Sequence, residues 1–334
     1  MTSNKPFNCF LDVVDRYDNF PRHHLNPEAY TDTTNAYYHL RVGSSQVTIG
    51  LMQPFVAEAV AEHEGWSIDK DASPMTLTLT GGHNEMSRTA IVATTFGKLR
   101  ADGKFEILKQ WRDQRKPAWN NGPDGEVLFS IERAAAPLLG IIMYGVHLLA
   151  YTSSDASNND IKFWVQRRSD TVTAHADHFD NTAAGGVSIG DIPFETMIRE
   201  ASEEAELPEA LVRKEAKPCG TLSYFHVRQP GSGYPGESGL LNPGVHFIYE
   251  LKLPADEAPR SGPDVKEFVL WDVEQMKKAM LAGSLKPSFA LFMLEFFIRH
   301  GIIHQGNEPD FVEISSRLHR PLEFPVAKSN TTKC

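Results

Sequence analysis

The sequence predicts an α/β sandwich preceded by an additional α+β domain. Three observations support this fold class. The chain has 334 residues, more than most single domains contain. Residues 1–139 mix short strand patterns with helix patterns. From residue 140 strand patterns dominate, and two helix patterns follow them. We therefore predict domains at 1–139 and 140–308, followed by a C-terminal tail at 309–334.

The first domain should contain both strands and helices. The segments YYHLRVG at 37–43 and MTLTLTG at 75–81 predict strands. The segment FVAEAVAEHEG at 55–65 and residues 88–100 predict helices. This mixed content is the basis of the α+β assignment.

The second domain should be built on a sheet. Its strand patterns lie at 141–152, 161–169, 220–227, 245–253 and 267–273, and helix patterns follow at 273–283 and 288–301. A further helix falls between the second and third of these strands. Strands interleaved with helices in this order predict an α/β sandwich.

The helix between the second and third strands carries three clustered carboxylates. Residues 185–207 read GGVSIGDIPFETMIREASEEAEL. Glu200, Glu203 and Glu204 are spaced i, i+3 and i+4, so their side chains share one helix face. Clustered carboxylates repel one another unless a cation lies among them. The spacing therefore predicts a divalent metal site, with Mg²⁺ or Mn²⁺ bound by carboxylate oxygens.

Arg199 stands beside this cluster. It precedes Glu203 by four residues, so its guanidinium can pair with that carboxylate and hold it in one rotamer. We expect Arg199 to support the metal site as much as the helix.

The segment resembles the Nudix box, in which a glycine and an acid precede the pattern Arg-Glu-aliphatic-x-Glu-Glu-x-Gly-aliphatic. The positions that match are Gly185, Arg199, Glu200, Ala201, Glu203, Glu204 and Leu207, and Gly186 completes the glycine pair. Asp191 stands where the family usually has Glu, and Glu206 where it usually has Gly. The resemblance implies a Nudix α/β/α sandwich and hydrolysis of a diphosphate.

A wider resemblance covers nearly the whole chain. It rests on FDNTAAGG, GTLSYFHV, GLLNPGVHFIYEL, KPSFALFMLEFFIRHGII and the junction segment SIERAAAPLLGIIMYGVHLLAY. These resemble a two-domain fungal and plant Nudix group related to thiamine pyrophosphokinase, in which an N-terminal domain of unknown function precedes the hydrolase. The resemblance implies conversion of oxo- and oxy-thiamine diphosphate to monophosphates, a metabolite-repair role. We expect no kinase activity.

The general base has several candidates. Nudix enzymes take it from the box or from a carboxylate farther along the chain, and this sequence offers Glu237, Asp264 and Glu267 outside the box. We rank Glu203 first and keep Glu267 as a catalytic candidate. A base must lie about 3 Å from the water that it deprotonates, and that distance requires a structure.

Basic side chains near the box could bind the diphosphate. Arg167 and Arg168 lie on the strand before the box, and adjacent strand residues face opposite sides, so at most one points into the site. Lys286 is a further candidate for a phosphate contact.

Composition limits the partners. The net charge of −10 and the pI near 5.7, with no basic stripe, argue against a nucleic-acid partner. Charged residues interrupt the apolar N-terminus, which predicts a cytoplasmic protein without a signal peptide. The longest apolar run, at 134–150, is too short and too broken to span a membrane. We therefore expect a small-molecule diphosphate as the substrate.

Two alternatives remain open. The box recognises metal and phosphate alone, so the substrate could be a nucleoside diphosphate linked to another group. The departures at Asp191 and Glu206 leave room for a catalytically silent binding protein.

Overall fold

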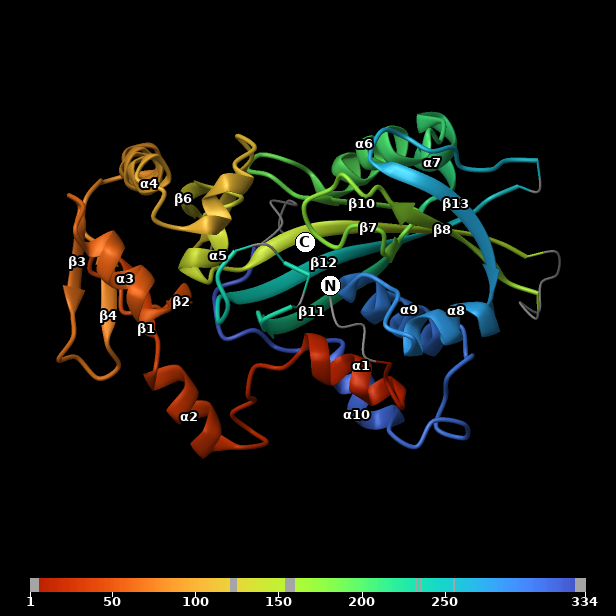
Figure 1. Ribbon diagram of the computed structural model, residues 1–334, viewed down its shortest axis with the longest axis horizontal. Helices are drawn as coiled ribbons and strands as arrows, with labels where there is room; N and C mark the ends of the chain where they lie inside the picture. The colour runs from red at the N-terminus through yellow and green to blue at the C-terminus, as the bar shows by residue number, and fades with distance from the viewer. Residues whose placement is uncertain are drawn as a thin grey trace.

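The computed structural model describes residues 6–120, 125–153, 160–231, 233–234, 236–254 and 256–327, which form two packed parts (Figure 1). The smaller part contains a four-stranded sheet of order β2-β1-β4-β3 and a two-stranded sheet. Its strands are β1 (Tyr38–Val42), β2 (Gly50–Met52), β3 (Trp66–Asp69), β4 (Thr76–Leu79), β5 (Arg115–Trp119) and β6 (Val127–Glu132). Its helices are α2 (Pro27–Asn35), α3 (Pro54–Ala61), α4 (Glu85–Ala101), the 3₁₀ helix η1 (Glu106–Gln110) and α5 (Ala136–Leu139).

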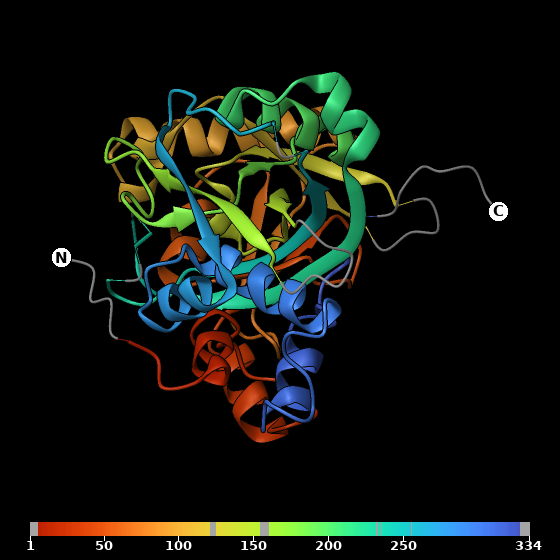
Figure 2. The same cartoon turned by 90° about the vertical axis from the view of Figure 1, so that its right-hand side faces the viewer.

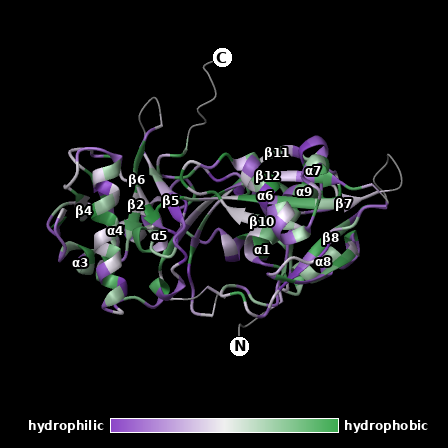
Figure 3. Ribbon diagram, turned by 90° about the horizontal axis from the view of Figure 1, so that it is seen from above, coloured by the Kyte–Doolittle hydropathy of each residue, from purple (hydrophilic) through white to green (hydrophobic). Residues whose placement is uncertain are grey.

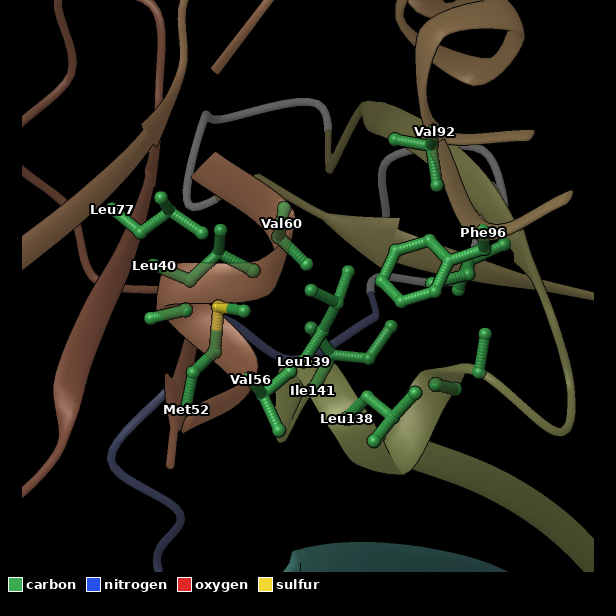
Figure 4. Packing of buried hydrophobic residues seen from close by; sticks show 14 of the residues in the cluster. Leu40, Met52, Val56, Val60, Leu77, Val92, Phe96, Leu138, Leu139 and Ile141 are labelled. Atoms are coloured by element: carbon green, nitrogen blue, oxygen red, sulfur yellow. The ribbon is translucent and has the colours of Figure 1, made fainter. Parts of the chain in front are cut away.

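One hydrophobic core holds the smaller part together. Leu40 and Leu77, from the two central strands, are fully buried, as are Val56 and Val60 on α3. Figure 4 shows these side chains with Leu138, Leu139 and Ile141 from the domain junction. Because strands and helices share this core, the segment has the predicted α+β character.

The larger part is built on a seven-stranded sheet. Five strands follow the order β11-β12-β7-β8-β13, while β10 pairs with β7 and β9 pairs with β8. Their bounds are β7 (Met143–Thr152), β8 (Lys162–Arg168), β9 (Phe179–Asp180), β10 (Ala183–Gly186), β11 (Lys217–Val227), β12 (Leu241–Lys252) and β13 (Val265–Asp272). The strand β7 pairs in parallel with β12 and antiparallel with both β8 and β10. Since β8 and β10 pair with the same edge of β7, the sheet divides there, next to the helix that carries Glu200, Glu203 and Glu204, which we call the carboxylate helix.

Helices cover both faces of this sheet. One face carries α6 (Pro193–Ala205) and α7 (Glu209–Glu215), and the other carries α8 (Val273–Leu281) and α9 (Pro287–Arg299). In Figure 2 the green α6 and α7 lie above the strands and the blue C-terminal helices lie below them. Hydrophobic colour runs along the central strands in Figure 3, whereas the peripheral loops are largely hydrophilic. This confirms the predicted α/β/α sandwich with an additional N-terminal domain.

The first helix differs from the predicted domain division. The helix α1 (Phe10–Tyr17) packs on α8, α9 and β11 of the larger part, with Val13 and Val14 fully buried. The predicted tail likewise contains a helix, α10 (Phe311–Arg317), which packs against α1. Both helices are short, so few turns were available to show a helical period. Residues from both predicted terminal regions therefore complete the second core.

A buried carboxylate joins these two segments. Asp18, at the end of α1, accepts hydrogen bonds from Arg22 at 2.6 Å and from Arg320 at 3.1 Å. Arg317, on α10, lies 3.5 Å from the same carboxylate.

Among the described residues, no helix combines the length and the apolar character required to cross a membrane.

Candidate functional site

The carboxylate helix α6 follows the loop that leaves β10. Pro193 stands in its first turn, where a missing N–H costs nothing. Met197, Ile198 and Ala201 are buried against the sheet, so packing fixes the helix while the neighbouring face stays available. The rigid mounting suits a site that must hold several charges in fixed positions.

The three glutamates of α6 occupy different environments. Glu204 accepts hydrogen bonds from the Gln166 side chain at 3.0 Å and from the Ala184 backbone at 2.9 Å. The side chain of Glu200 is only 14% exposed, whereas that of Glu203 is 58% exposed. Glu204 therefore faces the divided sheet, and Glu203 faces solvent.

Arg199 lies between two of these carboxylates. Its guanidinium is 2.9 Å from the Glu200 carboxylate and 3.4 Å from that of Glu203. The structure thus shows the expected pair with Glu203 and adds a shorter one with Glu200. One guanidinium orients both side chains.

The glycine pair before α6 makes room for charged side chains. A Cβ on Gly185 would collide with the carboxylate of Glu200, and a Cβ on Gly186 would lie 2.7 Å from the Lys116 Nζ. Lys116 comes from β5 of the smaller part, and burial lowers the pKa of its ammonium to about 8. Adjacent strand residues face opposite sides, so Glu200 and Lys116 flank β10.

Gly185→Ala should displace Glu200 and lower activity without unfolding the protein. The new Cβ meets only the end of a flexible side chain, which can rotate away from β10. We expect kcat to fall about tenfold to a hundredfold, as for other small misplacements of catalytic groups. Gly97→Ala in α4 is the control, because a Cβ there has no neighbour within 4 Å. Equal activity of the two variants would contradict the role given to Gly185.

The two departures from the box are accommodated locally. The Asp191 carboxylate accepts a hydrogen bond from the Ser188 backbone at 3.0 Å and so closes the loop before α6. Glu206 takes the left-handed conformation, with φ of 50°, that the usual glycine would adopt more easily. Neither departure removes a carboxylate from the helix face.

The adjacent arginines on β8 point to opposite sides. Arg167 pairs with Asp177 at 2.8 Å and with Glu267 at 3.2 Å, and all three are partly exposed. Arg168 instead pairs at 3.1 Å with Asp180, whose side chain is fully buried. Of the two, Arg168 lies toward the interior.

Asp180 is a functional candidate that the sequence analysis missed. It lies 2.7 Å from the Lys286 ammonium as well as 3.1 Å from Arg168. Burial raises its pKa, but these two cations outweigh burial and hold the pKa well below its usual value. Asp180 belongs to the segment FDNTAAGG, so its place just before the box was the available signal.

Two histidines extend this polar interior. The Asn181 side-chain amide is hydrogen-bonded to the His147 ring at 2.9 Å, and the ring centres of His147 and His246 lie 4.3 Å apart. Tyr224 bonds His246 at 3.3 Å. Burial lowers the pKa of His246 to about 3, so this ring is neutral at physiological pH. A polar path therefore runs from Asp180 to Tyr224.

Tyr224 lines a cavity between the two parts of the chain. The cavity has a volume of about 200 Å³ and two charged lining side chains, Arg133 and Arg228. Arg228 stacks 4.8 Å from the centre of the Tyr234 ring, which also lines the cavity. Burial lowers the pKa of Arg228 to about 10. The cavity combines aromatic faces with positive charge.

Arg133 lines this cavity and is affected by the charge of Glu200 on α6. Burial lowers the pKa of its guanidinium, and the charges of Glu132 and Glu200 partly offset that effect. Arg133 belongs to the smaller part, at the end of β6, and the sequence analysis did not select it. Its place in the junction segment SIERAAAPLLGIIMYGVHLLAY was the available signal.

Two of the three candidate bases outside the box, Glu237 and Glu267, have other partners. The Glu237 carboxylate accepts hydrogen bonds from the backbone of Glu106 and Ile107 and so caps η1. Glu267 pairs with Arg167 on the exposed side of β13. Glu203 lies on α6 beside Glu200 and Glu204, and its carboxylate is exposed to solvent.

The described residues include no group of three or more His, Cys, Asp or Glu side chains already gathered around a single metal position. The donor set nevertheless fits a hard cation. Burial, with the nearby charges of Asp180 and Glu200, raises the pKa of Glu204 to about 7. Burial and the charge of Glu203 also raise the pKa of Glu200. A divalent cation would supply the counter-charge that these carboxylates lack.

Comparison with known proteins identifies the family. A NUDIX domain model matches residues 152–292, and a model of a domain of unknown function, DUF4743, matches residues 26–143. The chain is 30% identical over 328 residues to uncharacterized protein YJR142W of Saccharomyces cerevisiae, covering 95% of this chain and 92% of that protein. The chain belongs to the Nudix family. Its two-domain layout confirms the predicted combination of an N-terminal domain of unknown function with a Nudix domain.

Two plant relatives carry the family name. Nudix hydrolase 24, chloroplastic, of Arabidopsis thaliana is 30% identical over 254 residues, covering 73% of this chain and 64% of that protein. Nudix hydrolase 20, chloroplastic, of the same plant is 32% identical over 233 residues, covering 69% of this chain and 58% of that protein. The chain thus spans about 60% of the length of these two relatives. These matches confirm the prediction of a hydrolase acting on diphosphate bonds.

Solved structures show a weaker likeness. The crystal structure of DR0079 from Deinococcus radiodurans has a TM-score of 0.38 and 20% identity, covering 62% of this chain and 100% of that chain.

Proposed function

We propose that this Nudix protein is a Mg²⁺-dependent hydrolase that converts oxo- and oxy-thiamine diphosphate to their monophosphates, a metabolite-repair role. The observation that carries the proposal is the cavity between the domains, which is lined by Tyr224, Tyr234 and two arginines, one of which, Arg133, is affected by the charge of Glu200 in the Nudix box. Aromatic faces suit a planar heterocycle, and guanidinium groups suit a phosphate or a carbonyl oxygen.

The size of the cavity favours a compact organic group. Its volume of about 200 Å³ is below the 300–1,000 Å³ common for sites that enclose drug-sized ligands. One ring of the substrate fits this space more readily than a whole dinucleotide does. A nucleoside diphosphate derivative remains the second candidate, because its base could enter the same cavity.

The Nudix box would hold the metal. Glu200 and Glu204, assisted by Glu203, would bind Mg²⁺ or Mn²⁺, which neutralises phosphate oxygens and lowers the pKa of a bound water. Arg199 orients Glu200 and Glu203 through its two ion pairs. We assign the general base to Glu203, whose carboxylate is exposed and so can accept a proton from water.

The N-terminal domain would bind the organic part of the substrate. It supplies Arg133 to the cavity, and Glu237 of the Nudix domain caps η1 across the junction.

Deleting the N-terminal residues would not test this role alone, since the deletion also removes α1 from the Nudix core. Arg133→Gln is the sharper change, and we expect it to raise KM more than it lowers kcat.

The test is phosphate release with Mg²⁺ from a panel of thiamine diphosphate, its oxo and oxy forms, ADP-ribose and nucleoside diphosphates. We expect the oxo and oxy forms to be preferred. The oxo form should be the best, because loss of the thiazolium charge removes repulsion from Arg133 and Arg228. Preference for a nucleotide would contradict the proposal of a thiamine substrate. No phosphate release from any compound would favour a catalytically silent binding protein.

A further inference from the structure

The N-terminal domain reaches directly into the loop of the Nudix box. Lys116 of β5 donates hydrogen bonds from its Nζ to the Val187 carbonyl at 3.0 Å and to the Ser188 hydroxyl at 3.2 Å. Its residue exposure is only 2%. The backbone joins the same contact, because the Ile189 N–H donates to the Arg115 carbonyl at 3.0 Å. Strand β5 therefore holds the segment that connects β10 to α6.

The ammonium of Lys116 is buried and is bonded to neutral acceptors. In the part of the chain that the structure describes, no carboxylate lies within ion-pair distance of its ammonium. A buried charge held by neutral acceptors is less stable than a paired one, so a purely structural role would be served better by an apolar side chain. The ammonium instead contributes positive charge near the box, since the carboxylates of Asp191 and Glu200 act to raise its pKa.

The glycine pair ties Lys116 to the metal-binding face. Gly185 leaves room for Glu200 on one side of β10, and Gly186 leaves room for the Lys116 ammonium on the other. The loop that Lys116 holds leads directly into α6, and Asp191 closes that loop through the Ser188 amide. A shift of this loop would move β10 and the start of the helix together.

We propose that Lys116 of the N-terminal domain is a positioning residue for the Nudix reaction, acting through Val187 and Ser188 to hold the box in its working geometry. The proposal rests on the proposed diphosphate hydrolysis. It assigns the N-terminal domain a part in catalysis as well as in substrate binding. Catalytic groups that shift by about 1 Å lose rate on the order of a hundredfold, so a side chain remote from the reacting atoms can control kcat.

The test compares Lys116→Met, Ser188→Ala and the double variant, with oxo-thiamine diphosphate as substrate. We expect Lys116→Met to lower kcat about tenfold to a hundredfold with a smaller change in KM. Ser188→Ala should have a smaller effect, and the double variant should be no slower than Lys116→Met alone, because both changes remove one shared contact. Lys104→Met, an exposed lysine of the same domain, is the matched control.

Hydrogen exchange tests the same idea without turnover. In Lys116→Met the amides of residues 187–191, including that of Ile189, should exchange faster than in the wild type. A lowered melting temperature with unchanged kcat would overturn the proposal, as would additive effects of the two substitutions. If the wild type hydrolyses no compound of the panel, the proposed function fails, and the exchange rates still decide the role of Lys116.

Discussion

Glu204→Gln should abolish Mg²⁺-dependent hydrolysis and, at the same time, stabilise the metal-free protein above pH 7. The substitution keeps the shape and the acceptor for the Gln166 and Ala184 hydrogen bonds but removes the charge. Removing outer partners of metal ligands already costs 10- to 100-fold in affinity or activity, so we expect the loss of a ligand charge to exceed about a hundredfold. The measurement is phosphate release across a range of Mg²⁺ concentrations.

The stability effect has a defined pH dependence. The pKa of Glu204 is about 7 in the folded protein against 4.5 for an ordinary glutamate. A raised pKa contributes stability that is complete below pH 4.5 and is lost as the pH rises through 7. The glutamine variant has no such loss, so its advantage should grow between about pH 4.5 and pH 7 and then level off, at no more than about 3 kcal/mol.

Thermal unfolding in the presence of a chelator checks this prediction. Glu206→Gln, at the exposed end of the same helix, is the matched control and should show no growing advantage. Saturating Mg²⁺ should reverse the order, because the metal stabilises the wild type by binding to its folded state. A constant difference between variant and wild type across the pH range would contradict the environment described for Glu204.

Asp180→Asn should strongly destabilise the Nudix domain. Its fully buried carboxylate is bonded to both Lys286 and Arg168, and an amide would leave two cations without their counter-charge. Breaking a buried ion pair in this way costs about 3–5 kcal/mol. The measurement is the free energy of unfolding in urea.

Asp177→Asn provides the matched control. Asp177 also pairs with an arginine and a lysine, at 2.8 Å from Arg167 and 3.0 Å from Lys266, but its side chain is 48% exposed. Exposed pairs contribute about 0–1 kcal/mol, so the control should unfold almost like the wild type. Similar losses for the two variants would show that burial of Asp180 does not govern its contribution.

The sequence predicted the parts of the site that follow from helical spacing. Glu200, Glu203, Glu204 and Arg199 lie within six residues of one another, so a single helix fixes their relative positions. The sandwich was predictable for the same reason, since each strand carries its own local pattern. The substrate, the general base and the metal stay predictions.

Contacts between distant segments could not be predicted in this way. Lys116 and Val187 are 71 residues apart, and Lys286 and Asp180 are 106 apart. A lone lysine in a strand pattern ordinarily indicates a solvent-facing side chain, and only the fold shows that Lys116 is buried against a glycine. The short helices α1 and α10 were missed because each has fewer than nine residues.

The packing of α1 on the C-terminal helices bears on how the protein is made. The α1 helix leaves the ribosome long before α9 at Pro287–Arg299, its main partner, has been synthesised. At about 5–20 residues per second, this interval is on the order of ten seconds to a minute. During that time Val13 and Val14 lack the C-terminal helices that cover them in the folded protein, so this hydrophobic face of α1 stays unpaired on the nascent chain. The N-terminal sheet can fold early, but the Nudix domain becomes complete only when its last helices arrive.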